Sequence, residues 1–422
     1  MISESQERIL FEVATENVDE LLAIAEKYDL NASMIGELTE RLYYTVEFEG
    51  EVVADMPVKL LTEGAPTFER PSTAPAERDI GDKPELPADL KQAVIDILSS
   101  HNIASKEWIY RQYDHEVQVR TVDKPGSDAG VLRIADGKGL ALSCGCNPGH
   151  TLLDPYEGGK GTLIENSMNL AVKGAEGIAL VDCLNFGNPE KPDIYWQFKH
   201  AILGLGDAAR DLSIPVVGGN VSLYNESGEY GTAIVPTPSI GLIGITGDLE
   251  TVPASFFEGE GNSVILVGET FDEMGGSEYY NIKGLRNNGN VPKVRENAPK
   301  TVETLINIIR EGKIEAAHDV SAGGLATALA EMCKENGANI DLSGVGEGLR
   351  ADDLLFSESH ARAILVTSEK DKVLEMLGDI PCTVIGTVGG DDLNIKGNGF
   401  DLSFTLDEIA DARASLTKLM ME

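Results

Sequence analysis

An internal repeat constrains this chain more than any other feature of its sequence. ISESQERILFEV at residues 2–13 matches FSESHARAILVT at residues 356–367, with Ser-Glu-Ser and a following Arg in the same places. A second match, MIG at residues 34–36 against VIG at residues 384–386, follows at an offset of 350 residues, close to the 354 of the first. Two matches at nearly one offset indicate a duplication.

The two copies differ in what comes before them. Roughly 250 residues of α/β sequence precede the second copy, and nothing precedes the first. We therefore expect the C-terminal part of a duplicated protein, with one complete copy and only the tail of the other. We also expect the incomplete copy to expose an apolar sheet edge that an N-terminal half would cover. The alternative is a terminal strand that resembles the second copy by chance.

The composition is that of a globular protein with two or three domains. Of 422 residues, 42% are hydrophobic and 25% charged, which is enough for sizeable cores. The sequence has neither an apolar run of membrane-spanning length nor a readable signal peptide, so we expect a cytoplasmic protein without a membrane partner. Its net charge of −36 argues against nucleic acid as a partner, because phosphate backbones need Lys and Arg.

The chain has five cysteines, of which only Cys144 and Cys146 are clustered. This arrangement indicates reduced thiols rather than a zinc site.

The sequence also suggests where the domains begin and end. Residues 1–61 read as the tail of a domain, with a helix that starts after Asn17 and a hairpin near residues 41–53. Residues 62–88 hold five prolines and read as an exposed linker. Two α/β domains are expected at residues 89–248 and 249–422.

Two apolar runs, at residues 178–181 and 214–217, predict neighbouring buried strands. Asp182 follows the first strand, and Gly218, Gly219, Asn220 and Ser222 follow the second. Short polar groups and bare backbone N–H at such corners can hold a phosphate or a metal ion. This stretch is therefore the first candidate for a ligand site.

Two weaker candidates lie on helices. Glu165 and Asn169 are four residues apart on a helix expected at residues 160–172 and share one face. Residues 321–324 bring two glycines to a helix N-terminus, where either an anion or a neighbouring strand would fit.

The motifs DPYEGGK, VDCLNFGNPEKP, VVGGNVSLYN, PTPSIGLIG, DVSAGGLATALAE and LLFSESHAR carry a resemblance to a known family. The chain closely resembles the large, synthetase subunit of phosphoribosylformylglycinamidine synthase, in the aminoimidazole ribonucleotide synthetase superfamily. The resemblance runs from Ser3 almost to the C-terminus. It implies an α/β (α+β) fold of tandem units, each with an N-terminal mixed-sheet half and a C-terminal α/β half.

The resemblance also implies an activity. Family members use ATP to phosphorylate the amide oxygen of formylglycinamide ribonucleotide, and ammonia then displaces phosphate to give the amidine in purine biosynthesis. The ammonia comes from glutamine through a glutaminase subunit, usually with a small bridging subunit. The resemblance gives substrate contacts to Glu4, Ser5, Gln6 and Ser222, ATP contacts to Asp182 and Gly219, and a Mg²⁺ ion to Asn220.

A second, auxiliary nucleotide site occurs in some members, and there Asp128, Glu165 and Asn169 are the candidate neighbours of metal or phosphate. His318 and Asp319 are more typical of a helix-entry network than of catalysts. The chain departs from the family pattern at His360, where the first copy has Gln, and at the CGCN segment of Cys144 and Cys146. The second departure weakens the case for the auxiliary site.

The family's catalytic histidines would lie upstream of the first Ser-Glu-Ser segment. We therefore expect no amidine-forming activity from this chain alone, and name no catalytic residue in it. It would be a gene fragment or half of a split enzyme with a separate N-terminal half. The alternative is a non-catalytic nucleotide-binding scaffold that docks the glutaminase and bridging subunits. A kinase-like or selenophosphate-type sister is disfavoured by the LNFGNPEKP and NVSLYN strings.

Overall fold

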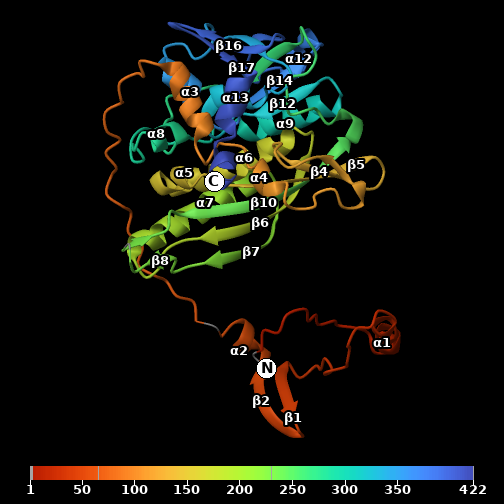
Figure 1. Ribbon diagram of the computed structural model, residues 1–422. Helices are drawn as coiled ribbons and strands as arrows, with labels where there is room; N and C mark the ends of the chain where they lie inside the picture. Colours follow the sequence, from red (N-terminus) through yellow and green to blue (C-terminus); the bar gives the residue numbers. More distant parts are fainter. Residues whose placement is uncertain (1–2, 65, 230, 422) are drawn as a thin grey trace. The chain divides into compact units, whose positions relative to one another are not determined.

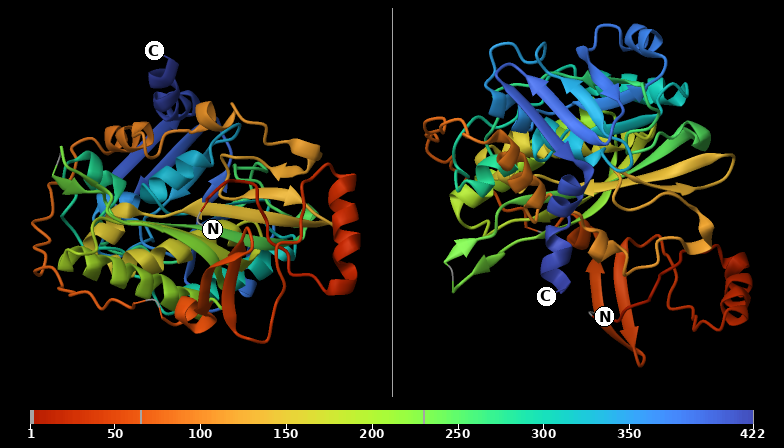
Figure 2. Two further views of the ribbon diagram at one scale, coloured as in Figure 1. Left: turned by 90° about the horizontal axis from the view of Figure 1, so that it is seen from below. Right: turned by 45° about the horizontal axis from the view of Figure 1, so that its top comes forward.

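A computed structural model describes residues 3–64, 66–229 and 231–421 (Figures 1 and 2). The chain divides into two compact units, unit 1 (Met1–Glu69) and unit 2 (Arg70–Glu422), which are described separately. The described helices include none that is long and apolar enough to cross a membrane.

Unit 1 is small and largely exposed. Its helix α1 (Val18–Lys27) follows a short 3₁₀ turn, and the hairpin of β1 (Tyr43–Phe48) and β2 (Glu51–Pro57) leads into α2 (Val58–Thr62). The predicted helix and hairpin are thus confirmed. Residues 3–13, which contain the first Ser-Glu-Ser segment, form no strand. A strand needs a neighbour for its backbone groups, and the structure provides none there.

The first half of unit 2 is built on a six-stranded sheet in the order β3-β4-β5-β10-β6-β7. Its neighbouring strands are antiparallel except β6 and β7, which are parallel. The strands are β3 (Thr121–Asp123), β4 (Gly130–Arg133), β5 (Lys138–Gly145), β6 (Glu176–Asn185), β7 (Val216–Ser222) and β10 (Thr237–Asp248), with the small β8 (Glu226–Ser227) and β9 (Thr232–Ala233) pair beside them.

Helix α6 (Pro155–Ala171) lies at the centre of unit 2 and is buried on nearly every side (Figure 1). Leu163 and Leu170 pack toward the first sheet, whereas Ile164 and Met168 pack with α9 and the second sheet. A helix that packs against other elements on two faces belongs to the core and not to the surface. The helices of this half are α3 (Leu90–Ser99), α4 (Glu107–Tyr110), α5 (Pro148–Leu153), α6 and α7 (Pro192–Asp211).

The second half carries a seven-stranded sheet in the order β12-β14-β11-β15-β13-β16-β17, with only β13 and β16 parallel. Its strands are β11 (Ser263–Val267), β12 (Ala316–Asp319), β13 (Ala338–Asp341), β14 (Ala363–Thr367), β15 (Cys382–Val388), β16 (Asp392–Gly397) and β17 (Phe400–Thr405). Its helices are α8 (Glu278–Ile282), α9 (Ala298–Arg310), α10 (Gly324–Glu331), α11 (Ala351–Phe356), α12 (Lys370–Leu377), α13 (Leu406–Arg413) and α14 (Ser415–Met421). The predicted mixed α/β fold is confirmed.

The proline-rich segment is largely exposed, as expected, and its second part also contacts the second half of unit 2. Arg78 Nη2 donates to the Gly289 carbonyl at 2.7 Å, and Gly289 N–H donates to the Ile80 carbonyl at 2.9 Å. Lys83 pairs with Asp272 at 3.0 Å. The part of this segment that belongs to unit 2 is therefore held along the second half by hydrogen bonds and an ion pair.

Candidate functional site

Strands β6 and β7 bring three of the predicted ligand-site residues together. In the parallel register Asp182 lies beside Gly219, and Cys183 lies beside Asn220. A Cβ at position 219 would lie 2.1 Å from Asp182 Oδ1, so only glycine fits against this carboxylate. Asp182 and position 219 therefore face the same side of the sheet, whereas Asn220, the next residue of the edge strand β7, directs its side chain to the other side.

The predicted corners are wrong in one respect. Asp182 and Asn220 lie within strands rather than after them, since β6 continues to Asn185 and β7 to Ser222. Strand β6 has hydrogen-bonded neighbours on both sides, β10 and β7, and these extend it past the polar residues. Because β7 is the last strand of the sheet, its outer backbone groups are left unpaired in the sheet.

Two opposing effects act on the pKa of the Asp182 carboxyl group. Partial burial raises its pKa, and the backbone N–H of Asn220 donates a hydrogen bond that lowers it. The Asp182 carboxylate and the side-chain amide of Asn220 both offer oxygen atoms, the kind of ligand that Mg²⁺ prefers.

Ser222 lies farther along the same edge strand, beside Asn185 in the register. Its hydroxyl donates to Asn225 Oδ1 at 3.2 Å, and Asn225 Nδ2 donates to the Phe186 carbonyl at 3.0 Å. The carboxyl ends of β6 and β7 are therefore tied together by Asn225, which the sequence reasoning did not single out.

The other predicted substrate residues, Glu4, Ser5 and Gln6, belong to unit 1 and are exposed. Gln6 Nε2 donates to the Glu4 carbonyl at 2.9 Å, and Ser5 Oγ lies 2.9 Å from Ser3 Oγ. These contacts are local to the loop. The loop is therefore described within unit 1 alone.

The second copy of the loop is buried, and its Glu358 carboxylate accepts several hydrogen bonds. Glu358, the counterpart of Glu4, accepts backbone N–H bonds from Glu278 and Gly323, both at 2.8 Å, and is 2% exposed. Asn147 Nδ2 donates to the same carboxylate at 3.0 Å. Gly323 is the N-cap of α10, so the anion expected at this helix start is a carboxylate of the chain itself.

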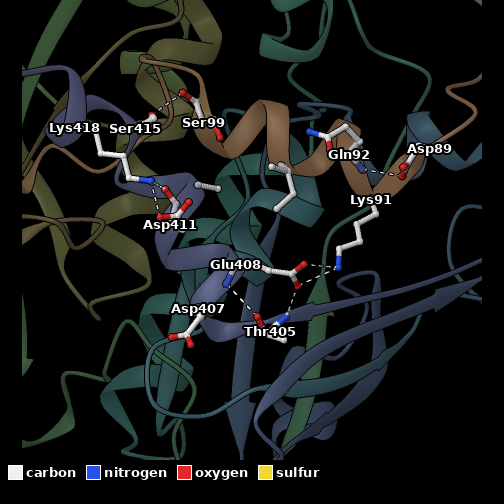
Figure 3. Close-up of a pocket in the computed structure, with 12 residues that line it drawn as sticks. Asp89, Lys91, Gln92, Ser99, Thr405, Asp407, Glu408, Asp411, Ser415 and Lys418 are labelled. Carbon is white, nitrogen blue, oxygen red and sulfur yellow. Dashed lines mark hydrogen bonds and ion pairs between the residues drawn. The ribbon is translucent and has the colours of Figure 1, made fainter.

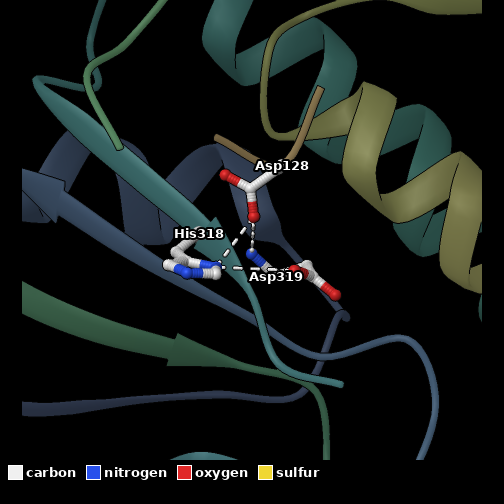
Figure 4. A group of neighbouring side chains, drawn as sticks. All are labelled: Asp128, His318 and Asp319. Atoms are coloured by element: carbon white, nitrogen blue, oxygen red, sulfur yellow. Dashed lines mark hydrogen bonds and ion pairs between the residues drawn. The ribbon is translucent and has the colours of Figure 1, made fainter. Parts of the chain in front are cut away.

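A buried cluster of Asp128, His318 and Asp319 lies where β12 ends (Figure 4). His318 Nδ1 is 2.8 Å from Asp128 Oδ1 and 3.4 Å from Asp319 Oδ1. The backbone N–H of Asp319 donates to Asp128 Oδ1 at 3.1 Å. His318 and Asp319 form a network with Asp128 at the end of β12, and His318 Nε2 also lies 3.6 Å from Glu331 Oε2 at the C-terminal end of α10. Their role at a helix entry stays a prediction.

Lys173 was missed by the sequence reasoning and is the main cation beside this cluster. Its ammonium is fully buried, donates to Ser255 Oγ at 2.6 Å and pairs with Asp123 at 2.7 Å. Asp128 Oδ2 lies 3.9 Å away and has no hydrogen-bond partner among the described residues. The sequence places Lys173 just after a helix, where a lysine is ordinarily solvated, so nothing in the pattern indicates its burial.

Burial and neighbouring charges shift the pKa values of the acidic groups in this region in opposite directions. Burial raises the pKa of Asp319 to about 6, and burial together with Asp319 and Glu358 raises the pKa of Glu165 to about 8. Burial also acts on Asp128, but His318 and Lys173 outweigh it and lower the pKa of Asp128. The oxygen donors suit a hard cation at Asp128 Oδ2, while Lys173 and His318 already neutralise the carboxylates. Asn169 is half-buried on the same helix as Glu165.

A surface groove of about 610 Å³ lies between α3 and α13 (Figure 3). Its charged groups pair with one another, Lys91 with Glu408 at 2.8 Å and Lys418 with Asp411 at 2.5 Å. It contains none of the predicted site residues. We assign no ligand to this groove. All five cysteines are free, in line with the expected reduced thiols.

Comparison with protein families gives two matches. The C-terminal domain of AIR synthase related proteins matches residues 1–49 and 259–397, and the N-terminal domain of the same family matches residues 126–246. The C-terminal domain is thus matched in both copies of the internal repeat, which confirms the duplication.

Curated relatives match the whole chain. It is 62% identical over 422 residues to phosphoribosylformylglycinamidine synthase subunit PurL of Methanosarcina mazei, covering 100% of this chain and 59% of the relative. The corresponding protein of Methanocaldococcus jannaschii is 45% identical over 416 residues, covering 95% and 56%. This chain therefore spans less than two thirds of the relatives it matches.

Among solved structures, PurL of T. maritima complexed with FGAR superimposes with a TM-score of 0.64 at 19% identity. The match covers 77% of this chain and 54% of that chain. At this identity the likeness shows a shared fold.

Proposed function

Because this chain belongs to the family of AIR synthase related proteins, we propose that it is part of an ATP-dependent carbon–nitrogen ligase of purine biosynthesis. The reaction is the conversion of formylglycinamide ribonucleotide and ammonia to formylglycinamidine ribonucleotide. The names of the relatives from Methanosarcina mazei and Methanocaldococcus jannaschii support this activity. The T. maritima PurL structure, which is complexed with FGAR, supports the substrate. A cytoplasmic location is part of the proposal.

The observation that carries the proposal is the pair of strands β6 and β7. It combines a half-buried carboxylate, Asp182, the glycine against which this carboxylate packs, Gly219, and the amide side chain of the next residue, Asn220. A nucleotide site needs backbone that a phosphate can approach closely and oxygen ligands for its metal ion. Gly219 and Asn220 lie on the exposed edge strand β7, and Asp182 lies beside them on β6.

In this proposal Asp182 and Gly219 bind ATP, and Asn220 holds Mg²⁺ through its side-chain oxygen. When bound, Mg²⁺ would neutralise charge on the transferring phosphoryl group. Ser222 contacts the ribonucleotide from the end of the same strand, and Glu4, Ser5 and Gln6 contact it from the unit 1 loop.

The proposed chemistry has two steps. The amide oxygen of the substrate attacks the γ-phosphorus of ATP and ADP leaves, which makes the amide carbon electrophilic. Ammonia then adds to that carbon and inorganic phosphate leaves. Because no side chain named here exchanges a proton with the reacting atoms, the contribution of these residues is alignment and charge neutralisation.

The proposed partners follow from the same reaction. Ammonia would come from glutamine through a glutaminase subunit, with a small bridging subunit, and an N-terminal half is a further proposed partner. Nucleic acid is not a proposed partner.

A second candidate is a non-catalytic scaffold that binds a nucleotide and docks the glutaminase and bridging subunits. The observation that favours it is the saturation of the second copy, where Glu358 is bonded by two backbone N–H groups and Lys173 lies against Asp128. This candidate predicts that no variant of the proposed site on β6 and β7 changes turnover.

Asp182→Asn separates the two candidates. The chain would be co-expressed with the part of the M. mazei relative that it does not match, and product formation measured with ATP and ammonia. Loss of the carboxylate should lower kcat/KM by about 100-fold or more, because a group that positions the nucleotide acts in the transition state.

Asp96→Asn, on the exposed face of α3, is the matched control and should leave turnover unchanged. If Asp182→Asn retains the activity of the unsubstituted complex, the nucleotide site does not lie on β6 and β7.

A further inference from the structure

The cluster of Asp128, His318 and Asp319 has the side chains of a divalent-cation site. One ligand atom from each residue lies within 4.8 Å of the others. The Asp128 side chain is fully buried, and its Oδ2 has no hydrogen-bond partner among the described residues. Carboxylate oxygens are the ligands that Mg²⁺ prefers. The residue types alone would therefore place a metal ion here.

Lys173 brings a positive charge to the same oxygens. Its side chain is 0% exposed, and Nζ lies 2.7 Å from Asp123 Oδ2 and 3.9 Å from Asp128 Oδ2. Nζ also donates to Ser255 Oγ at 2.6 Å and to the Pro253 carbonyl at 3.4 Å. Two carboxylates, a hydroxyl and a carbonyl thus surround one ammonium. That is the kind of oxygen set expected around a hard metal ion.

The other oxygen of Asp128 also faces groups of the chain. Oδ1 lies 2.8 Å from His318 Nδ1 and accepts a hydrogen bond from the backbone N–H of Asp319 at 3.1 Å. Only Oδ2 is left for a further ligand, and Oδ2 is the oxygen nearest to Lys173. A divalent ion bound there would meet the ammonium at close range, and like charges repel strongly in a buried site.

Local structure directs Lys173 into the cluster. Gly174 takes a left-handed φ of 65° just after α6, and the backbone N–H of Lys173 donates to the Leu170 carbonyl at 3.0 Å. Glu165, Asn169 and Lys173 follow one another at four-residue spacing, which places them on one side of this helix. The side that carries the expected neighbours of a metal ion or phosphate therefore also carries the ammonium.

Removal of the ammonium from this position would be unfavourable. The Asp123 side chain is 22% exposed and that of Asp128 is fully buried, so little water can replace Lys173 around them. A buried charge that loses its partner is strongly destabilising. An incoming metal ion would therefore have to displace a cation that both carboxylates already hold.

We propose that the Lys173 ammonium is the resident cation of this cluster and takes the position of a divalent metal ion. The auxiliary site that the family resemblance implies for Asp128, Glu165 and Asn169 therefore does not fit a metal ion in this chain. Lys173 is a positioning residue, which holds Asp123 and Asp128 in place as a bound metal ion would.

The cluster is independent of the proposed reaction. None of its residues is among those proposed to bind ATP, Mg²⁺ or the ribonucleotide on β6 and β7. A metal ion held by Asn220 would be present in every variant below and would add the same signal to each. Failure of the proposed reaction and failure of the proposed role of Lys173 are therefore separate outcomes.

The first test is iron-directed cleavage of the full, unsubstituted chain. Fe²⁺ accepts carboxylate and imidazole ligands and, with ascorbate and hydrogen peroxide, cuts the backbone beside the bound ion. Mass spectrometry of the fragments should show no cut at residues 123–128 or 316–319. A cut in either segment would overturn the proposal, because it would place a metal ion in the cluster together with Lys173.

Lys173→Met removes the charge and keeps most of the packing. Methionine is one atom shorter than lysine, so the position of Nζ is left free between the two carboxylates. Fe²⁺ should now cut both segments, and the variant should bind Mn²⁺ at this site with a Kd lower by about 100-fold or more. The electron paramagnetic resonance signal of free Mn²⁺ measures the binding. A folded Lys173→Met chain that gains neither the cuts nor Mn²⁺ would contradict the proposal.

Two controls locate the gained site. Lys160→Met removes an ammonium from the same helix, where Lys160 lies 3.5 Å from Asp211, whose side chain is 49% exposed. This variant should gain no Mn²⁺, because water already solvates that carboxylate. Asp128→Asn added to Lys173→Met should abolish the gained binding. Retention of the ion by the double variant would show that Asp128 is not its ligand and would overturn the assignment.

The stability of Lys173→Met gives a second measurement. The variant should unfold at a lower urea concentration, because it leaves buried carboxylates unpaired. Mg²⁺ should raise its midpoint more than that of Lys160→Met or the unsubstituted chain, since an ion that binds only the folded chain stabilises it. If Lys173→Met is unfolded without metal, Mg²⁺ should fold it. An equal response of all three chains, or a variant that stays unfolded with Mg²⁺, would contradict the proposed role of the ammonium.

Discussion

His360 shows what one substitution between the two copies does. It stands where the first copy has Gln6, and its Nε2 is buried without a hydrogen-bond partner among the described residues. Gly161 makes room for the ring, since a Cβ there would lie 2.3 Å from that nitrogen. Burial, and then the neighbouring His150, lower the pKa of His360 to about 3.

A pH dependence follows from this lowered pKa. Between about pH 6.5 and pH 3 the unfolded chain binds a proton at His360 that the folded chain does not, so acid lowers the unfolding free energy. His360→Gln, which restores the residue of the first copy, should remove up to about 1.4 kcal/mol per pH unit of that loss. Urea unfolding between pH 6.5 and pH 4 measures the effect. His101→Gln, at an exposed position, should follow the unsubstituted chain; parallel curves for all three proteins would contradict the account.

At the scale of single residues, the sequence predicted which residues lie close together better than it predicted which side chains are buried. It singled out Asp182, Gly219 and Asn220, and the structure makes them neighbours. It did not indicate the burial of Lys173, because the oxygens around that ammonium come from Asp123 and Ser255, far away in the sequence. Partners of buried charges are set by tertiary packing, which residue spacing does not encode.

At the scale of elements, the crossing of α6 and α7 depends on glycine. A Cβ at Gly204 of α7 would lie 2.0 Å from the Tyr156 carbonyl oxygen of α6, and one at Gly159 would lie 2.2 Å from the Ala201 carbonyl oxygen. The two helices therefore approach backbone to backbone. This contact holds the central helix against its neighbour on the six-stranded sheet.

Gly204→Ala tests this contact. The added methyl group meets backbone that cannot move aside, so the unfolding free energy should fall by about 1–3 kcal/mol. Gly206→Ala, in the same helix, meets nothing nearer than an Arg210 side-chain nitrogen at 3.6 Å and should stabilise by up to about 1 kcal/mol. Denaturant unfolding of the two variants compares them directly. A Gly204→Ala protein as stable as the Gly206→Ala protein would show that the helices are not in close contact.

Helices and hairpins were predictable where the sequence pattern that indicates them lies within one short segment. The helix expected at residues 160–172 and the hairpin near residues 41–53 both form, as α6 and as β1–β2. Strand ends were not predictable, because β6 runs on to Asn185 through its pairing with β10 and β7. For the same reason residues 3–13 form no strand, since a strand exists only with a neighbour.

At the scale of the whole molecule, the internal repeat accounts for the domains that the chain contains. Unit 2 contains both family domains, and unit 1 contains a second, partial copy of the C-terminal domain. The sequence alone was enough for this organisation, since it depends on matching segments and not on packing. The domain boundaries at residues 61, 88 and 248 stay predictions.

The most direct measurement is formation of formylglycinamidine ribonucleotide from formylglycinamide ribonucleotide, ATP and ammonia. It would be made with the full chain alone and with the chain co-expressed with the unmatched part of the M. mazei relative. The account predicts no product from the chain alone and ATP-dependent product from the complex. Product from the chain alone would contradict the claim that this chain is one part of a shared synthetase site.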